Sequence, residues 1–172
     1  MNIFVSPLKF SEWITSFLII GFLKAVVSLI FTSALAFFLY KFEIFIYGFY
    51  IIPFFFLLIL TGWWVGFFVA SIVLRYGTRV QTLAWTTVAV ISPFSAVYYP
   101  LSTLPNWAQN VGLFIPTTYI FEGAREVIER GELDPKKLII CLILNIFYLA
   151  LSLIFLKKSF GKILEKGLVK IH

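Results

Sequence analysis

The sequence has little charge and few of the residue types that build soluble catalytic or metal sites. Only 13% of its 172 residues are charged, against about 25% in a typical soluble domain. One cysteine and one histidine leave neither a disulfide framework nor a CxxC metal site, and we interpret His172 as an incidental tail rather than a ligand. A GxxxxGK[ST] phosphate loop is also absent, which excludes P-loop ATP binding. We therefore expect no catalytic residue, no metal and no cofactor in this chain.

Apolar residues take the place of the missing charge. They make up 61% of the chain, and the mean hydropathy is +0.99, which indicates an all-α polytopic membrane protein. The net charge of +6 does not predict nucleic-acid binding, because the basic residues flank apolar runs. Cys141 lies within such a run, where a buried small hydrophobic residue is the expected role.

Four runs are long enough to cross a bilayer, which needs about 20 mostly apolar residues. The last run begins after Asp134, a good helix cap, and Pro135, which suits the first helical position. The second lies in an uncharged stretch longer than a bilayer core, so we expect tilt or a break near Pro53. The predicted spans are residues 14–40, 50–74, 80–97 and 138–156 within a single transmembrane domain.

The distribution of Lys and Arg predicts the orientation. Eight basic residues fall on one side of the four spans and five on the other, which places both termini in the cytoplasm and the chain in the plasma membrane. The eight are Lys9, Arg75, Arg79, Lys157, Lys158, Lys162, Lys166, Lys170; the five are Lys41, Arg125, Arg130, Lys136, Lys137. Several of the eight lie in a basic cytoplasmic tail, residues 157–172, where attraction to anionic membrane lipid explains them.

The uncharged stretch YYPLSTLPNWAQNVGLFIP, residues 98–116, contains three prolines. Each proline removes a backbone donor, and irregular backbone in a membrane must be sheltered by protein or face water. We therefore predict a re-entrant element at the outer side, within an extracellular region spanning 98–131. The alternative is an ordinary extracellular loop with Trp107 as an interface anchor.

Residues 117–131, TTYIFEGAREVIERG, predict an amphipathic helix outside the membrane. Its apolar positions are Ile120, Ala124, Val127 and Ile128. The charges on the other face allow Glu122–Arg125 and Glu126–Arg130 pairs on neighbouring turns, and Gly131 is a natural stop.

The order of motifs in residues 92–128, SPFSAVYYPLSTLPNWAQNVGLFIPTTYIFEGAREVI, resembles the membrane subunits of type 2 ABC exporters. The similarity extends to SPLKFSEW, residues 6–13, which looks like the family's cytoplasmic coupling loop, and to LRYGTR, residues 74–79, which resembles an intracellular turn. One departure is Ala96, where many members have glycine before the aromatic-proline turn. The residues that carry the outer pattern are Tyr99, Pro100, Leu104, Pro105, Trp107, Pro116, Tyr119, Arg125.

The resemblance implies a permease subunit that exports a drug, lipid or polysaccharide with a separate ATP-binding cassette ATPase and a second permease copy. It covers the last four of the family's six spans, so we expect two N-terminal spans to be missing here. It assigns Tyr119, Glu122 and Arg125 to an extracellular helix. The ATPase-coupling loops would carry Pro7, Lys9, Glu12, Arg75, Arg79.

Other features have more than one interpretation. Gly62, Gly66 and Ala70 form a small-residue series that serves helix packing, either within this chain or in a dimer. Lys24 lies well inside a span, where a functional role competes with its side chain reaching the cytoplasmic interface. Trp63 and Trp64 face either lipid or a substrate path.

Two further functions compete with transport. A chain without catalytic residues also suits a membrane scaffold or assembly protein. A membrane enzyme using Glu122, Glu126 and Arg125 is the weaker alternative, because those charges fit pairing on a helix surface.

Overall fold

The computed structural model describes residues 10–41, 50–77, 80, 82, 86 and 89–169, and all the regular structure in these residues is helical. The chain divides into two units, Met1–Ile46 and Tyr47–His172. Three of the described helices are long and apolar enough to cross a membrane. The prediction of an all-helical membrane protein is therefore confirmed. The fourth predicted span, 80–97, is not among these three helices; it is described only at residues 80, 82, 86 and 89–97, and Ser92–Ser95 within it form a 3-10 helix.

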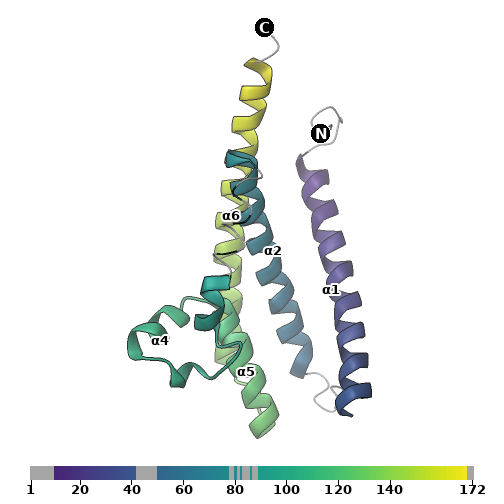
Figure 1. Cartoon of the computed structure of the whole chain (residues 1–172), viewed down its shortest axis with the longest axis vertical. Coiled ribbons are helices and arrows are strands. Elements are labelled where there is room, and N and C mark those ends of the chain that lie inside the picture. Colours follow the sequence, from purple (N-terminus) through teal and green to yellow (C-terminus); the bar gives the residue numbers. More distant parts are fainter. Residues whose placement is uncertain are drawn as a thin grey trace. The chain divides into compact units, whose positions relative to one another are not determined.

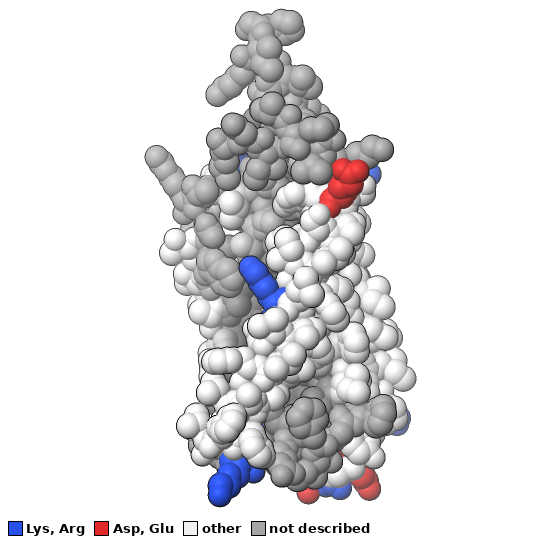
Figure 2. Space-filling model, turned by 90° about the vertical axis from the view of Figure 1, so that its right-hand side faces the viewer, with Lys and Arg blue, Asp and Glu red and all other residues white. Residues whose placement is uncertain are grey.

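The N-terminal unit contains one helix, α1, Phe10–Tyr40. It covers the predicted span 14–40, and its apolar side chains are largely exposed, including Val27, Ile30 and Phe31. Lys24 is also exposed on this helix. The face in Figure 2 is correspondingly almost uncharged along its middle, apart from one cation.

The second unit is organised around α2, Ile51–Tyr76, and α6, Pro135–Val169. The two helices lie side by side and run in the same direction (Figure 1). Their contacts advance together along both helices, from Thr61 with Asn145 to Phe68 with Phe155. The chain must therefore return along the length of this pair between the end of α2 and the start of α6.

Helix α6 begins as the sequence predicts. Pro135 is its first residue, and the Asp134 carboxylate accepts a hydrogen bond from the Lys136 amide at 2.9 Å. The helix does not end at residue 156 but continues to Val169. Its 35 residues span about 50 Å at ~1.5 Å per residue, more than the ~30 Å hydrocarbon core. The basic segment is thus an extension of the last helix.

Four short elements connect the return segment to α6, and the prolines mark their starts. They are η4, Ser92–Ser95; η5, Leu101–Thr103; α4, Asn106–Gly112; and α5, Pro116–Arg130. Pro105 caps α4 and Pro116 opens α5. In Figure 1 α4 stands to one side on a loop, whereas α5 crosses the first part of α6.

The core joins α2, α5 and α6. It consists of Phe54 and Leu57 from α2, Ile120 and Val127 from α5, and Cys141 from α6. A Cβ atom at Gly123 of α5 would lie 2.8 Å from the Phe54 ring, so glycine permits the close approach of α5 to α2.

The amphipathic prediction for α5 holds for most of its apolar positions. Ile120 and Val127 are buried and Ala124 is partly buried, but Ile128 is 55% exposed. The helix ends at Gly131, whose φ of 72° lies in the left-handed region that glycine adopts without strain.

Candidate functional site

Two charged side chains of α5 hold both ends of the turn formed by residues 96–101. The Arg125 guanidinium donates to the carbonyls of Ala96 at 2.6 Å and Val97 at 3.2 Å. The Glu122 carboxylate accepts from the Leu101 amide at 2.8 Å and pairs with Arg125 at 3.1 Å. Hydrogen bonds to charged groups are about twice as strong as neutral ones, so these contacts fix the turn firmly. We call Glu122, Arg125 and the turn that they hold the turn clamp.

Ala96 has an unusual backbone within the clamped turn. Its φ of 55° is left-handed, and its side chain is fully buried. An L-residue costs about 1–2 kcal/mol in this conformation, which explains why glycine suits the same position in the resembling family. The clamp on the Ala96 carbonyl helps to hold this strained residue.

Helix α4 packs back on the turn through a close contact. A Cβ atom at Gly112 would lie 2.9 Å from the Phe94 carbonyl oxygen, and the rings of Phe94 and Trp107 are 5.9 Å apart. Trp107 itself is 64% exposed, and Phe114 beyond the helix is 69% exposed. The element thus presents aromatic side chains outward while its backbone is fixed inward.

Two side chains of α6 donate hydrogen bonds to the backbone of residues 114–116, which leads into α5. We call this contact with α6 the seat. Tyr148 donates to the Phe114 carbonyl at 2.9 Å, and Cys141 donates to the Pro116 carbonyl at 3.3 Å. Tyr148 lies 13 residues after Pro135, about 20 Å along the helix. The backbone of residues 114–116 is therefore bonded to α6 well beyond its start.

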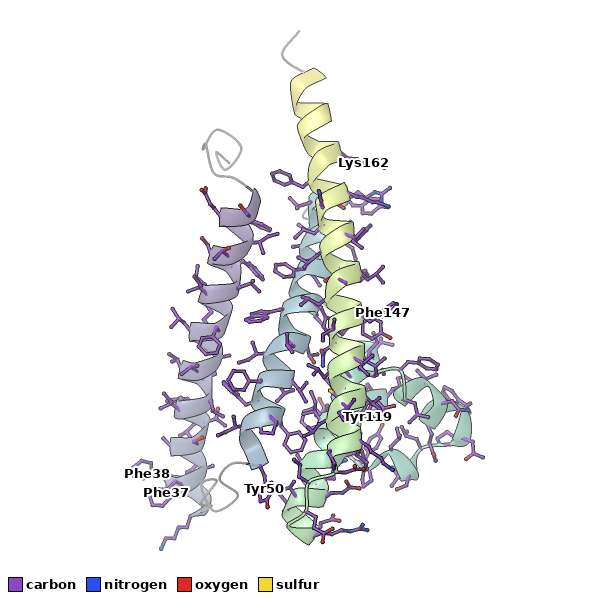
Figure 3. All side chains as sticks on the ribbon, turned by 180° about the vertical axis from the view of Figure 1, so that it is seen from behind. Phe37, Phe38, Tyr50, Tyr119, Phe147 and Lys162 are labelled. Atoms are coloured by element: carbon purple, nitrogen blue, oxygen red, sulfur yellow. The ribbon has the colours of Figure 1, made fainter. Side chains whose placement is uncertain are left out.

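Tyr119 adds a second hydroxyl contact, next to this segment. It donates to the Leu113 carbonyl at 2.9 Å and packs against the core cluster (Figure 3). Burial raises the pKa of the Tyr119 phenol above its usual value, which itself lies well above neutral pH.

Asn145 connects the seat to α2. This side chain is fully buried, and its carbonyl oxygen accepts from Thr61 at 2.9 Å and from Trp64 at 3.1 Å. Its amide donates to the Cys141 carbonyl at 3.1 Å. Hydrogen bonds therefore run from α2 through Asn145 and Cys141 to the first residue of α5.

The remaining predicted outer residues surround this site. Pro100 precedes η5 and Leu104 follows it, and the Leu104 carbonyl accepts from Gln109 at 2.7 Å. Tyr99 is half-buried. The Glu122–Arg125 pair is present as expected, but Glu126 pairs with Lys137 of α6, and the described residues contain no Glu126–Arg130 pair.

The predicted coupling residues are only partly described. Glu12 lies in the first turn of α1, and Arg75 lies in the last turn of α2 with its guanidinium 5.6 Å from the Tyr76 ring centroid. Pro7, Lys9 and Arg79 lie outside the described residues.

The small-residue series and the two tryptophans differ in environment. Gly62 is exposed, and an added Cβ would meet nothing within 4 Å, whereas Gly66 and Ala70 are partly buried. Trp64 bonds to Asn145, but the buried indole nitrogen of Trp63 has no hydrogen-bond partner.

The arrangement fits mechanical support rather than bond chemistry. Glu122, Arg125 and Glu126 bond to the backbone, to each other or to Lys137. The described residues contain no group of three or more His, Cys, Asp or Glu side chains suited to a metal. These contacts can fix the position of the broken outer segment.

Sequence reasoning missed the roles of Asn145, Cys141, Thr61 and Tyr148. The available signal was an amide side chain in the middle of the last apolar run, since a polar group in a membrane helix needs a partner. The sequence alone did not identify that partner, because Thr61 and Asn145 are 84 residues apart.

Comparison with known proteins gives one match. A family model described as ABC-2 family transporter protein matches residues 1–156. No curated protein and no solved structure matches significantly.

Proposed function

The chain belongs to the ABC-2 transporter family and is a membrane permease component of an ABC transporter, and from this premise we propose that it works in ATP-driven export. The transported drug, lipid or polysaccharide would pass along a path lined by this chain and a second permease copy. ATP hydrolysis would take place in a separate ATP-binding cassette subunit, since the sequence contains no phosphate loop of its own.

The observation that carries the proposal is the seating of residues 114–116 on α6. The Tyr148–Phe114 and Cys141–Pro116 hydrogen bonds hold the non-helical residues 114 and 115 and the first residue of α5 beside a helix that is long and apolar enough to span the membrane. Such backbone is tolerated at membrane depth only when protein shelters it. The seat therefore supports a re-entrant element at residues 98–116 that caps the outer end of the path.

The parallel course of α2 and α6 supports four spans. Two parallel membrane helices require the chain between them to cross the membrane once more, and residues 80–97 are the apolar candidate for that crossing. With α1, four crossings would leave both termini on the same side. The excess of basic residues assigns that side to the cytoplasm of the cell membrane.

Coupling to the ATPase would act through the cytoplasmic loops. Pro7, Lys9 and Glu12 precede or open the first span, and Arg75 and Arg79 follow the second. Closure of the ATP-binding subunits would push on these loops and tilt α2, and the Asn145 hydrogen bonds would pass that movement to the seat of the outer element.

The test reverses one charge on each side of the membrane in the full chain, co-expressed and purified with its ATP-binding subunit. Arg75→Glu places a negative charge in the proposed docking loop, so we expect severalfold less ATP-binding subunit to be recovered. Lys136→Glu changes the same charge at the start of α6, on the proposed outer side, and should leave recovery unchanged. The measurements are subunit stoichiometry and the ATP hydrolysis rate.

Two results would argue against this function. Equal recovery of the ATP-binding subunit with both variants would contradict its proposed docking on the loop after α2. A full chain that purifies with partner proteins but never with an ATP-binding subunit would favour the scaffold interpretation.

A further inference from the structure

A cavity of about 300 Å³ lies beside the seat and reaches Val97 at one end of the clamped turn. One wall is the face of α2 that carries Trp64, Val65 and Val69. The other walls are the chain around η4, residues 91–97, and the start of α5, residues 115–117. The cavity thus lies between α2 and the two stretches of chain, residues 91–97 and 115–117, that come just before and at the end of the proline-rich segment.

The lining offers hydrocarbon rather than hydrogen-bonding groups. The Thr61 hydroxyl lies 2.9 Å from the carbonyl oxygens of both Leu57 and Asn145, Trp64 donates to Asn145, and the Ser95 hydroxyl donates to the Ser92 carbonyl at 2.6 Å. The other α2 side chains in the wall are aliphatic or aromatic. A sugar or another strongly polar molecule would lose its water here without gaining these donors.

We propose that this cavity binds an acyl chain of a bilayer lipid. Apolar cavities stay dry and accept apolar guests, and a volume of about 300 Å³ is at the lower end of ordinary ligand sites. The medium around a membrane helix such as α2 consists of acyl chains, so the available guest has the chemistry that the wall requires. Its binding comes from close packing.

The location gives the lipid a role in support of the outer element. The bound chain fills the space between α2 and Pro116, whose carbonyl accepts from Cys141. It also contacts the chain next to Ala96, the strained residue of the turn clamp. The lipid therefore packs against one end of the clamped turn, at Val97, and against residues 115–117 at the start of α5.

Trp64 in the cavity wall provides a direct probe. In a full chain with Trp13, Trp63, Trp85 and Trp107 replaced by phenylalanine, Trp64 is the remaining tryptophan. Its fluorescence is measured in bilayers of phosphatidylcholine with dibrominated acyl chains, which quench tryptophan on contact. We expect strong quenching, reduced at least twofold when the larger ring of Val69→Phe or, independently, Val65→Phe occupies part of the cavity.

Phe56→Leu is the control, because Phe56 is 52% exposed on α2 and lies outside the cavity wall. It should leave the quenching unchanged, and circular dichroism must show the same helix content in every variant used. Mass spectrometry of the purified parent should identify a bilayer phospholipid that the filled variants retain less.

Three outcomes would overturn the proposal. Trp64 that brominated lipid does not quench would mean that acyl chains do not enter. Undiminished quenching in correctly folded filled variants would mean that the bilayer reaches Trp64 by another face. A co-purified amphiphile that is not a bilayer lipid, lost from the filled variants, would assign the cavity to a transported molecule.

Discussion

At the residue scale, Ala96 is constrained in three ways, two of them through its backbone. Its backbone is left-handed, its methyl group has no exposed surface, and its carbonyl accepts the 2.6 Å bond from Arg125. Glycine would relieve the backbone strain, but it would lose the buried methyl and gain freedom in the unfolded chain, at about 1 kcal/mol each. A β-branched side chain disfavours the left-handed backbone of this residue, and its additional atoms would have no space at this buried position.

We therefore expect opposite tolerance at position 96. Ala96→Gly should change the free energy of unfolding by less than about 1 kcal/mol, because relief of ~1–2 kcal/mol of strain offsets its losses. Ala96→Val should destabilise by about 2–3 kcal/mol through overpacking and an unfavourable φ. Unfolding in detergent micelles, followed by circular dichroism, measures both. A valine variant as stable as the glycine variant would contradict the left-handed assignment.

Asn145 is the second residue on which the site depends. Asn145→Leu keeps a side chain of similar size but removes the acceptor for Thr61 and Trp64 and the donor to Cys141. Hydrogen bonds between membrane helices contribute about 0.6–2 kcal/mol each. We expect a loss of about 1–3 kcal/mol in stability, measured by titration with a denaturing detergent.

The neighbouring position provides the control for that change. Ile146 is 54% exposed on the same helix, so Ile146→Leu should leave the midpoint unchanged. Equal midpoints for Asn145→Leu and the parent would show that the hydrogen bonds do not stabilise the α2–α6 pair.

At the element scale, α5 depends on how closely it approaches α2. Gly123→Ala would place a methyl group 2.8 Å from the Phe54 ring, and such overpacking costs about 1–3 kcal/mol. Gly62→Ala makes the same chemical change on α2 where no atom lies within 4 Å. We expect only Gly123→Ala to lower the thermal unfolding midpoint, and Phe54→Leu to restore part of the loss. A destabilising Gly62→Ala would instead indicate a further helix packed on that face.

The elements differ in how far the sequence predicts them. The start of α6 at Pro135 and the end of α5 at Gly131 follow from local signals, which need no knowledge of the fold. The lysines after residue 157 recur every four residues, which predicts a helix with these lysines on one face, and α6 continues to Val169. Because these lysines lie beyond the length of helix that a bilayer covers, their charges do not prevent the helix from continuing.

The site was less predictable than the helices. The prolines and Arg125 indicated where the backbone breaks and which cation lies nearby. The partner atoms of Arg125, however, are backbone carbonyls of residues 96 and 97, 28 or 29 positions away. Backbone acceptors leave no trace in side-chain patterns, so only the folded structure identifies the turn clamp and the Asn145 connection.

At the scale of the whole molecule, the direction of α2 and α6 constrains the topology. Both helices carry their first residues toward the outer element, since Phe54 and Cys141 meet in the same core cluster as Ile120 of α5. Their other ends carry Arg75 on α2 and Lys157 and Lys158 on α6. We propose that one side of the membrane receives the broken segment and that the other, the cytoplasmic side, receives the basic helix ends.

This topology predicts the labelling of single cysteines in a Cys141→Ser background, in which a hydroxyl keeps a donor for the Pro116 carbonyl. A membrane-impermeant maleimide should modify Ser102→Cys on intact cells, because Ser102 is exposed in η5. Tyr76→Cys, at the other end of α2 and 62% exposed in the parent, should react only after permeabilisation. Leu142→Cys within α6 should remain unlabelled in both conditions, because thiolate forms poorly in hydrocarbon. Labelling of Tyr76→Cys on intact cells, with Ser102→Cys protected, would invert the chain, and the turn clamp would then face the cytoplasm.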